Sequence, residues 1–174
     1  STTNVYGFDK EGKIDESYVS TNLNFYAKSK YKMEDYLVKF CNMNSINYYI
    51  YRIPGIVGGN YNNNFIINLI KKIKKNENLR LFNKNSKFNN IIHVDNLCDL
   101  IIDSLKYKKN LILNVGTKYP LKIKNLLKFI ILKLKKKNIF FNKKINFDNS
   151  NQKSFYLNLK KTNKYSKKIL STKE

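Results

Sequence analysis

The 174-residue sequence contains only two cysteines, one histidine and two arginines. Cys41 and Cys98 have no close spacing, so the sequence predicts neither a disulfide framework nor a zinc site, and it fits a reducing, cytoplasmic setting. No uncharged apolar run approaches the roughly 18 residues that a membrane-spanning helix requires. Residues 1–13 are polar and lack the apolar segment of a secretory signal. We therefore expect no membrane partner.

The formal net charge of +22 comes almost entirely from lysine, because Arg52 and Arg80 are the only other basic residues among 34. Proteins that read bases or clamp phosphates favour arginine. Lysine is accompanied here by abundant asparagine and isoleucine, and codons rich in A and T account for all three. A nucleic-acid-binding module with interleaved aromatics such as Tyr48, Tyr49 and Tyr51 is the alternative class of function, but we do not expect a nucleic-acid partner.

The hydrophobic pattern predicts alternating strands and helices, and hence an α/β fold. Residues 1–7 are typical of a strand end that enters a loop, and the polar, lysine-rich tail 149–174 is expected to lie loosely on the surface. The predicted helices cover 25–43, 65–74, 96–106 and 123–136, and the predicted strands cover 47–52, 79–82, 90–94, 111–115 and 139–147. With 42% apolar residues, the chain can bury a core.

Polar residues that cap helices precede three of these segments. Asn24 is the expected N-cap of the first helix, and one of Asn62, Asn63 and Asn64 is the expected N-cap of the second. Asp95 is the expected cap of the third.

Tyr26 and Lys30 lie four residues apart in the first predicted helix, so their side chains share one face. A fixed cation favours the phenolate and lowers the pKa of a tyrosine from its reference value near 10 toward neutrality. This change makes a tyrosine a better general acid or base. In a chain with 13 tyrosines and many lysines, however, this spacing alone is more typical of a packed tyrosine and a solvated lysine.

Several motifs surround this pair in a fixed order. They are Thr2-Thr3-Asn4-Val5-Tyr6-Gly7, Ile14-Asp15-Glu16, Glu34 one turn after Lys30, Arg52-Ile53-Pro54-Gly55-Ile56-Val57-Gly58, Asn64-Phe65-Ile66, His93-Val94-Asp95-Asn96-Leu97 and Leu113-Asn114-Val115-Gly116. The series closely resembles the extended short-chain dehydrogenase/reductases, the NAD-dependent epimerase/dehydratase family. This family includes nucleotide-sugar 4-epimerases, 4,6-dehydratases and 4-keto reductases. The resemblance covers roughly residues 1–135.

The resemblance implies a role for each matching residue. The Thr2 hydroxyl would bind the reacting oxygen, Tyr26 would exchange a proton with it, and Lys30 would hold the nicotinamide ribose. Hydride would pass between the sugar and NAD or NADP. The expected catalytic residues are Thr2, Tyr26 and Lys30; the expected cofactor-binding residues are Tyr26, Lys30, Pro54, Gly55 and Ile56; the expected substrate-binding residues are Thr3, Asn64, Arg80 and Asn89. No metal is expected.

The sequence departs from the family in its glycines. The family's Gly-x-x-Gly-x-x-Gly turn brings backbone N–H groups onto the cofactor pyrophosphate, and no such turn occurs here. Gly55, Gly58 and Gly59 follow a strand but match the substrate-side loop. We therefore expect this chain to be a carboxyl-terminal part that lacks much of the nucleotide-binding lobe and is inactive by itself.

Two further departures concern the substrate. Asn89 stands where many members have an arginine that clamps the phosphates, and an asparagine cannot make that bidentate contact. Arg80, Lys84 or Lys87 could replace it. Thr3-Asn4 occupies the positions where 4,6-dehydratases typically have an Asp-Glu pair, which favours an epimerase or a 4-keto reductase.

The resemblance predicts the second half of a Rossmann-like parallel sheet in residues 1–59, a smaller α/β substrate-binding region in 60–148, and the tail 149–174. The expected function is an NAD(P)-dependent nucleotide-sugar epimerase or 4-keto reductase in surface polysaccharide sugar biosynthesis. A 4,6-dehydratase, a basic nucleic-acid-binding module and an inactive fragment are the alternatives. The resemblance also implies a homodimer through the helix of Tyr26 and Lys30, with His93 as a structural residue near a helix start.

Overall fold

A computed structural model describes residues 1–59, 63–149, 153–166, 168 and 171–173. The predicted boundary between 59 and 60 falls beside residues 60–62, which lie outside the described residues. The helices are α1 (Phe25–Met43), α2 (Phe65–Lys74), α3 (Val94–Leu105) and α4 (Ile123–Lys135), with 3-10 helices η1 (Thr3–Tyr6) and η2 (Thr162–Lys164). In the described part of the chain, no helix is long and apolar enough to span a membrane.

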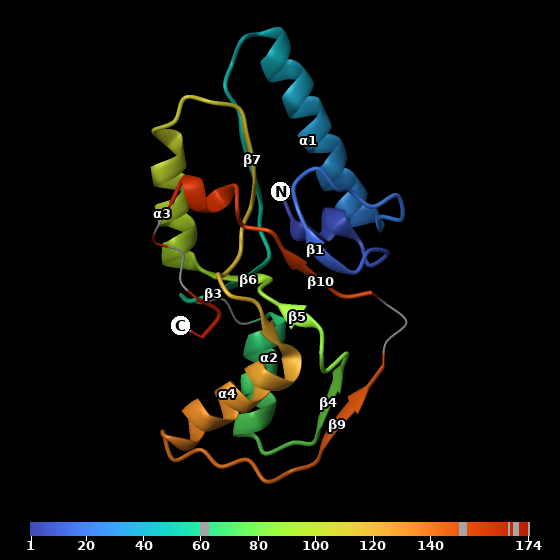
Figure 1. Cartoon of the computed structure of the whole chain (residues 1–174), viewed down its shortest axis with the longest axis vertical. Helices are drawn as coiled ribbons and strands as arrows, with labels where there is room; N and C mark the ends of the chain where they lie inside the picture. The colour runs from blue at the N-terminus through green and yellow to red at the C-terminus, as the bar shows by residue number, and fades with distance from the viewer. Residues whose placement is uncertain (60–62, 150–152, 167, 169–170, 174) are drawn as a thin grey trace.

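The strands form pairs, most of them parallel, so the α/β prediction is confirmed (Figure 1). The parallel pairs are β1 (Gly12–Ile14) with β10 (Phe155–Leu157), β2 (Tyr49–Arg52) with β7 (Leu111–Asn114), β3 (Gly55–Val57) with β6 (Ile91–His93), and β4 (Leu79–Phe82) with β9 (Ile145–Asp148). The antiparallel pair is β5 (Lys87–Phe88) with β8 (Leu121–Lys122). Parallel partners require long crossover connections, which the helices provide.

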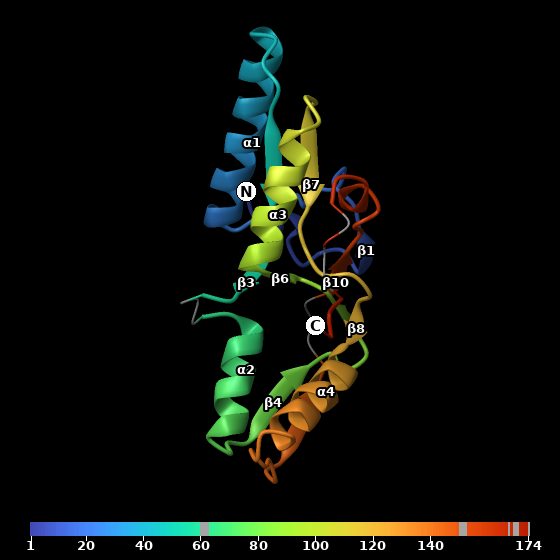
Figure 2. The ribbon, with the colours of Figure 1, turned by 90° about the vertical axis from the view of Figure 1, so that its left-hand side faces the viewer.

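The hydrophobic core has three parts, spread along the long axis of the molecule (Figures 1 and 2). At one end, α3 packs on β2 and β7, with Leu100 and Leu113 fully buried. At the other end, α2 and α4 pack with β4 and β9 around Ile73 and Leu79. A third cluster joins η1, β1 and β10. The three clusters together involve helices and strands along the whole length of the molecule.

Side-chain caps set the starts of the helices. The Oδ1 atom of Asn24 accepts from the backbone N–H of Ala27 at 2.9 Å, and α1 covers the predicted range. Asn64 caps α2 in the same way, with Ile67 as the donor at 3.0 Å.

The cap predicted for α3 is wrong. His93, not Asp95, is the N-cap, because Nδ1 of His93 accepts from the backbone N–H of Asp95 at 3.3 Å. Asp95 lies inside the first turn, where its carboxylate faces the positive end of the helix dipole. A structural role for His93 at a helix start agrees with this geometry.

The strand end predicted at the amino terminus is short. Only Thr2 bridges to a neighbour, Ile53, and residues 3–6 form η1 instead. The Oγ1 atom of Thr2 accepts from the backbone N–H of Asn4 at 3.2 Å, which starts this turn. The last predicted strand also differs, since β9 begins only at Ile145.

The expectation that the tail lies loosely on the surface is wrong for its described residues. β10 pairs with β1, and Phe155, Leu157 and Leu159 are buried. Alternate residues of a strand face the same side, so these three side chains enter one core. The Oγ1 atom of Thr162 then donates to the backbone oxygen of Asn114 at 2.6 Å. Residues 150–152, 167, 169, 170 and 174 lie outside the described part.

A buried ion pair connects α1 to β2. The Arg52 guanidinium is only 2% exposed and donates to the Glu34 carboxylate at 2.8–3.2 Å. Its Nη1 atom also donates to the Tyr6 hydroxyl at 3.1 Å and to the backbone oxygens of Glu16 and Tyr18 at 2.9 and 3.2 Å. Burial opposes the charge of Arg52, but hydrogen bonds with Glu34 and Tyr6 outweigh it and raise the pKa of Arg52. A buried charge is tolerable only with such complete pairing.

The network continues from Tyr6 to β7. The Tyr6 hydroxyl donates to Oδ1 of Asn114, and the backbone N–H of Asn114 donates to the Glu16 carboxylate at 2.8 Å. Burial raises the pKa of Tyr6 to about 12, although the nearby Arg52 charge partly opposes the shift. Side chains far apart in the sequence thus hold η1, α1, β2 and β7 together.

Replacing Arg52 by methionine should lower the free energy of unfolding by about 3–5 kcal/mol, because Glu34 would remain as an unpaired buried charge. Urea unfolding measures this. Lys39→Met on α1, the helix that carries Glu34, is the control: it breaks the exposed pair with Asp35 and should cost less than about 1 kcal/mol. A double Glu34→Met/Arg52→Met variant should recover part of the loss. Equal effects of Arg52→Met and Lys39→Met would refute a dominant role for the buried pair.

The raised pKa of Tyr6 predicts a loss of stability at high pH. Its folded pKa of about 12 exceeds the ordinary value of 10.0, so folding favours the protonated phenol. The stabilisation is complete below pH 10 and is lost as the pH rises through about 12. Tyr6→Phe should flatten the fall of unfolding free energy between these values, whereas Tyr119→Phe, at a 74% exposed position, should not. Identical pH profiles for the two variants would contradict the prediction.

Candidate active site

The amino-terminal segment lies against the end of β2. The backbone N–H of Thr3 donates to the Ile53 oxygen at 3.1 Å, and Thr2 forms a parallel bridge with Ile53. Both threonines are buried. Ile53 and Pro54 connect β2 to β3, so the structure brings Thr2 next to the segment of Pro54, Gly55 and Ile56.

Tyr26 and Lys30 lie in the first turns of α1, and this end of the helix lies beside η1 (Figure 1). The Lys30 ammonium lies 5.6 Å from the centroid of the Tyr26 ring, within the range of a cation–π contact. Both side chains are exposed, Tyr26 by 52%. They are free to meet a ligand from the same face of the helix.

The Asn64 side chain makes its hydrogen bonds within the protein. Besides capping α2 with Oδ1, it donates from Nδ2 to the backbone oxygen of Ile56 at 2.6 Å. A side chain at Gly55 would come within 3.4 Å of the Asn64 Cβ atom. Asn64 therefore ties β3 to the start of α2.

The predicted substrate contact of Asn89 is contradicted by its burial. The residue is 1% exposed, and Nδ2 donates to the backbone oxygens of Thr117 and Leu157 at 3.1 Å each. Its Oδ1 atom accepts from the N–H of Leu157 at 2.8 Å. The amide joins β10 to the rest of the chain because three backbone groups converge on it, and no polar atom of its side chain is left for a substrate.

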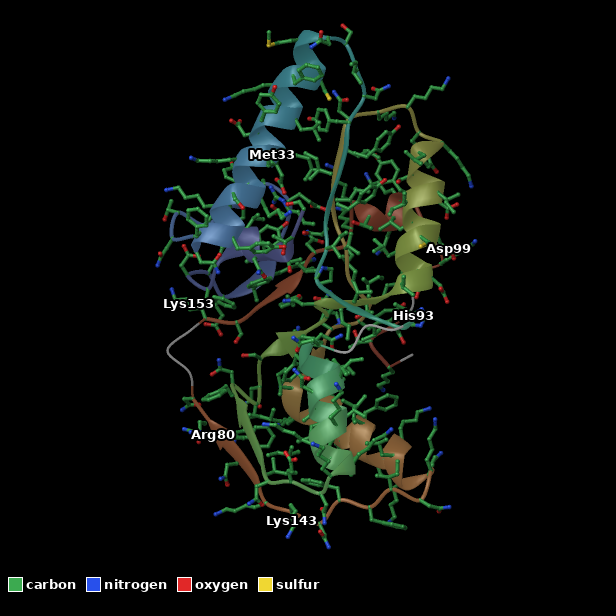
Figure 3. The ribbon with its side chains drawn as sticks, turned by 180° about the vertical axis from the view of Figure 1, so that it is seen from behind. Met33, Arg80, His93, Asp99, Lys143 and Lys153 are labelled. Atoms are coloured by element: carbon green, nitrogen blue, oxygen red, sulfur yellow. The ribbon has the colours of Figure 1, made fainter. Side chains whose placement is uncertain are left out.

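Arg80 lines a cleft of about 590 Å³, which we call the cationic cleft. Lys87 and Lys153 line it as well, and Arg80 and Lys153 lie on the same edge of the molecule in Figure 3. Arg80 also pairs with Asp148 on the neighbouring strand. Five phenylalanines complete its aromatic lining: Phe8, Phe65, Phe82, Phe88 and Phe155. Lysine and phenylalanine side chains together suit a ligand with both anionic and planar parts.

Sequence reasoning missed Lys153 and Phe8 as lining residues, since they come from the tail and from the loop after η1. It also missed the pairing of Glu34 with Arg52. A signal existed, because Glu34 belongs to the quoted motif and Arg52 is one of only two arginines.

Two of the three tyrosines considered for nucleic-acid binding are used in packing. Tyr49 and Tyr51 pack against the core beside α3, and the Tyr51 hydroxyl lies 2.5 Å from Oγ of Ser104. Aromatic platforms for bases must be exposed, so this strand does not offer one. Within the described residues, no cluster of His, Cys, Asp and Glu could hold a metal ion.

Comparisons with solved structures show the fold. UDP-glucuronic acid 4-epimerase from Bacillus cereus, in complex with NAD, has a TM-score of 0.75 and 23% identity, covering 99% of this chain and 56% of that chain. The dTDP-glucose 4,6-dehydratase from Bacillus anthracis, also with NAD, has a TM-score of 0.72 and 18% identity, covering 95% of this chain and 53% of that chain. RMD from Pseudomonas aeruginosa with NADPH has a TM-score of 0.76 and 17% identity, covering 99% of this chain and 61% of that chain. The architecture is thus Rossmann-like, and the chain spans little more than half the length of these structures.

Among curated proteins, no significant match is found. The model of the NAD dependent epimerase/dehydratase family, however, matches residues 1–116. This range contains every motif from Thr2 to Gly116 that surrounds Tyr26 and Lys30. The chain therefore belongs to the NAD-dependent epimerase/dehydratase family.

Proposed function

We propose that this chain supplies the acid–base and substrate-binding side of an NAD(P)-dependent nucleotide-sugar epimerase or 4-keto reductase. The observation that carries the proposal is the convergence of two segments: Thr2 beside the end of β2, and Tyr26 with Lys30 on the end of α1 that contacts η1. A hydroxyl, a phenol and an ammonium at one place suit proton exchange with a sugar hydroxyl or carbonyl.

Tyr26 is the proposed general acid and base. When a sugar hydroxyl is oxidised, the phenolate of Tyr26 takes its proton; when a ketone is reduced, the phenol returns it. The Lys30 ammonium lies on the same helix face, 5.6 Å from the centroid of the Tyr26 ring. Thr2 already accepts an N–H bond at Oγ1, so its own hydroxyl proton is available to the sugar oxygen.

The residues present fit the nicotinamide end of the cofactor. Exposed hydroxyl and ammonium donors of Tyr26 and Lys30 suit ribose hydroxyls, and the segment of Pro54, Gly55 and Ile56 would border the ring. When bound, NAD or NADP accepts or donates the hydride. No glycine-rich diphosphate turn occurs in this sequence, so these side chains account for that end of the cofactor only.

The cationic cleft is the proposed site for the nucleotide diphosphate. Arg80, Lys87 and Lys153 can neutralise the phosphates, and Phe65 and Phe82 can pack against the base. Its volume of about 590 Å³ lies within the range of about 300–1,000 Å³ that is usual for small-molecule sites. Asn64 holds β3 beside the start of α2. The backbone of Thr3 contacts the end of β2. Asn89 has no place in this site.

Thr3-Asn4 supports an epimerase or a reductase over a 4,6-dehydratase, since neither side chain is a carboxylic acid. A role in surface polysaccharide sugar biosynthesis follows from the substrate class. We further propose the division into 1–59, 60–148 and 149–174, with the third part completing the cores of the other two.

A homodimer through α1 is also proposed. The helix leaves several large apolar side chains uncovered, and such a surface favours a protein partner. The exposed fractions are 91% for Phe25, 64% for Met33, 65% for Tyr36 and 85% for Met43.

Tyr26→Phe should reduce kcat at least about a hundredfold, because general acid–base catalysis contributes about 10²–10⁴, while substrate binding is retained. The assay uses the chain joined to the NAD-binding part of a structural relative, with a panel of UDP- and dTDP-sugars. Tyr31→Phe, five residues further on α1, is the matched control and should leave kcat unchanged. If Tyr26→Phe turned over normally, the acid–base assignment would fail; a 4-keto-6-deoxy sugar product would instead establish a dehydratase.

Charge reversal in the cationic cleft should weaken substrate binding. Lys87→Glu/Lys153→Glu should raise KM for the nucleotide-sugar at least about tenfold, an effect of about 1.4 kcal/mol, with little change in kcat. Lys108→Glu/Lys109→Glu changes the net charge equally at a loop outside the cleft and should be neutral. Equal effects of the two double variants would show that net charge, not the cleft, attracts the substrate.

A further inference from the structure

A second cavity, of about 570 Å³, lies between α2 and α4 and is here called the helix cavity. Its wall is built mainly from aliphatic side chains, together with the rings of Phe88 and Phe129. Ile67 and Ile70 contribute from α2, Phe129 and Ile130 from α4, and Val57 from β3. Four of these five are only partly buried, so apolar surface faces the space. A cavity of this size is large enough for a small molecule.

The charged groups that line the helix cavity all have one sign. Lys133, Lys137 and Lys173 line it, and none of its described lining residues carries a carboxylate. Among the described residues, none of the three forms an ion pair with a carboxylate. Lys133 and Lys137 are four residues apart on and just beyond α4, a spacing at which like charges repel. An anion between them would relieve that repulsion.

The surrounding chain strengthens the positive field. Residues 104–147 contain no acidic residue and thirteen lysines. Charges of one sign around a low-dielectric recess focus the field and attract counter-ions. The recess therefore combines an apolar interior with a cationic rim.

The helix cavity is distinct from the cationic cleft, although Phe88 borders both. His93, which lines the helix cavity, lies on the opposite edge of the molecule from Arg80 and Lys153 (Figure 3). A nucleotide-sugar in the cationic cleft would leave this second space unfilled.

We propose that the helix cavity binds an amphiphile that has an alkyl chain and a single anionic head group. The alkyl chain lies against Ile67, Ile70 and Phe129, which removes apolar surface from water. The head group lies at the rim, between Lys133 and Lys137. This site is independent of the proposed reaction, because it uses neither Tyr26 nor the residues of the cationic cleft.

The test compares decanoate with decanol by isothermal titration calorimetry. Decanoate should bind at least about tenfold more tightly, and Lys133→Glu/Lys137→Glu should remove about that factor without affecting decanol. Lys108→Glu/Lys109→Glu, with the same change of net charge, should bind decanoate normally. Equal affinities for the two compounds, or equal effects of the two double variants, would overturn the proposal.

Filling the cavity tests the place of the alkyl chain. Ile67→Trp should weaken both compounds, and Val57→Phe serves the same purpose from the other wall; circular dichroism identifies whichever variant keeps the fold. Undiminished decanoate binding in a folded, filled variant sinks the idea. The proposal also fails if sedimentation shows that the unaltered protein is a dimer and that either filled variant is a monomer, because the occupant would then be a second copy of the chain.

Vesicles of phosphatidylglycerol separate the two sources of such an amphiphile. If co-sedimentation with vesicles is lost in the filled variant, the ligand is a membrane lipid. If vesicles are not bound while decanoate is, the ligand is a dissolved anion. Vesicle binding that persists in the filled variant, with no decanoate binding in the unaltered protein, would mean surface charge alone and would overturn the proposal.

Discussion

The buried pairing of Arg52 with Glu34 is the constraint on which the candidate active site depends. One guanidinium joins the helix α1, the strand β2, the Tyr6 hydroxyl and the backbone between Glu16 and Tyr18. Because a buried charge without partners is very costly, any arrangement that separates these elements is strongly disfavoured. The observed arrangement brings the end of α1 that carries Tyr26 to the segment that carries Thr2.

The network also separates rigid groups from available ones. Tyr6, Arg52 and Glu34 are almost inaccessible, and their hydrogen bonds are made within the protein. Tyr26 and Lys30 precede Glu34 on the same helix but are exposed. A reactive side chain on a helix that is fixed from behind keeps its geometry while remaining open to a ligand.

The helices were predictable because their signals are local. The spacing of apolar residues and the asparagine caps indicate the bounds of α1 and α2, and both signals involve residues only a few positions apart in the sequence. The motif order from Thr2 to Gly116 was likewise sufficient to indicate the family. The cap of α3 was missed because a histidine ring nitrogen accepts the N–H bond that an aspartate oxygen usually accepts. A histidine can do so only in the tautomer that leaves Nδ1 unprotonated, and the sequence pattern does not specify the tautomer.

The sequence alone determined the alternation of strands and helices, the order of the motifs and the pairing of Tyr26 with Lys30 on one helix face. Only the tertiary structure decided that the tail forms β10, that Asn89 is buried among backbone groups and that Lys153 reaches the cationic cleft. Helix periodicity and capping involve neighbours in sequence. Strand pairing and the burial of a polar amide depend on partners tens of residues away, which no local pattern specifies.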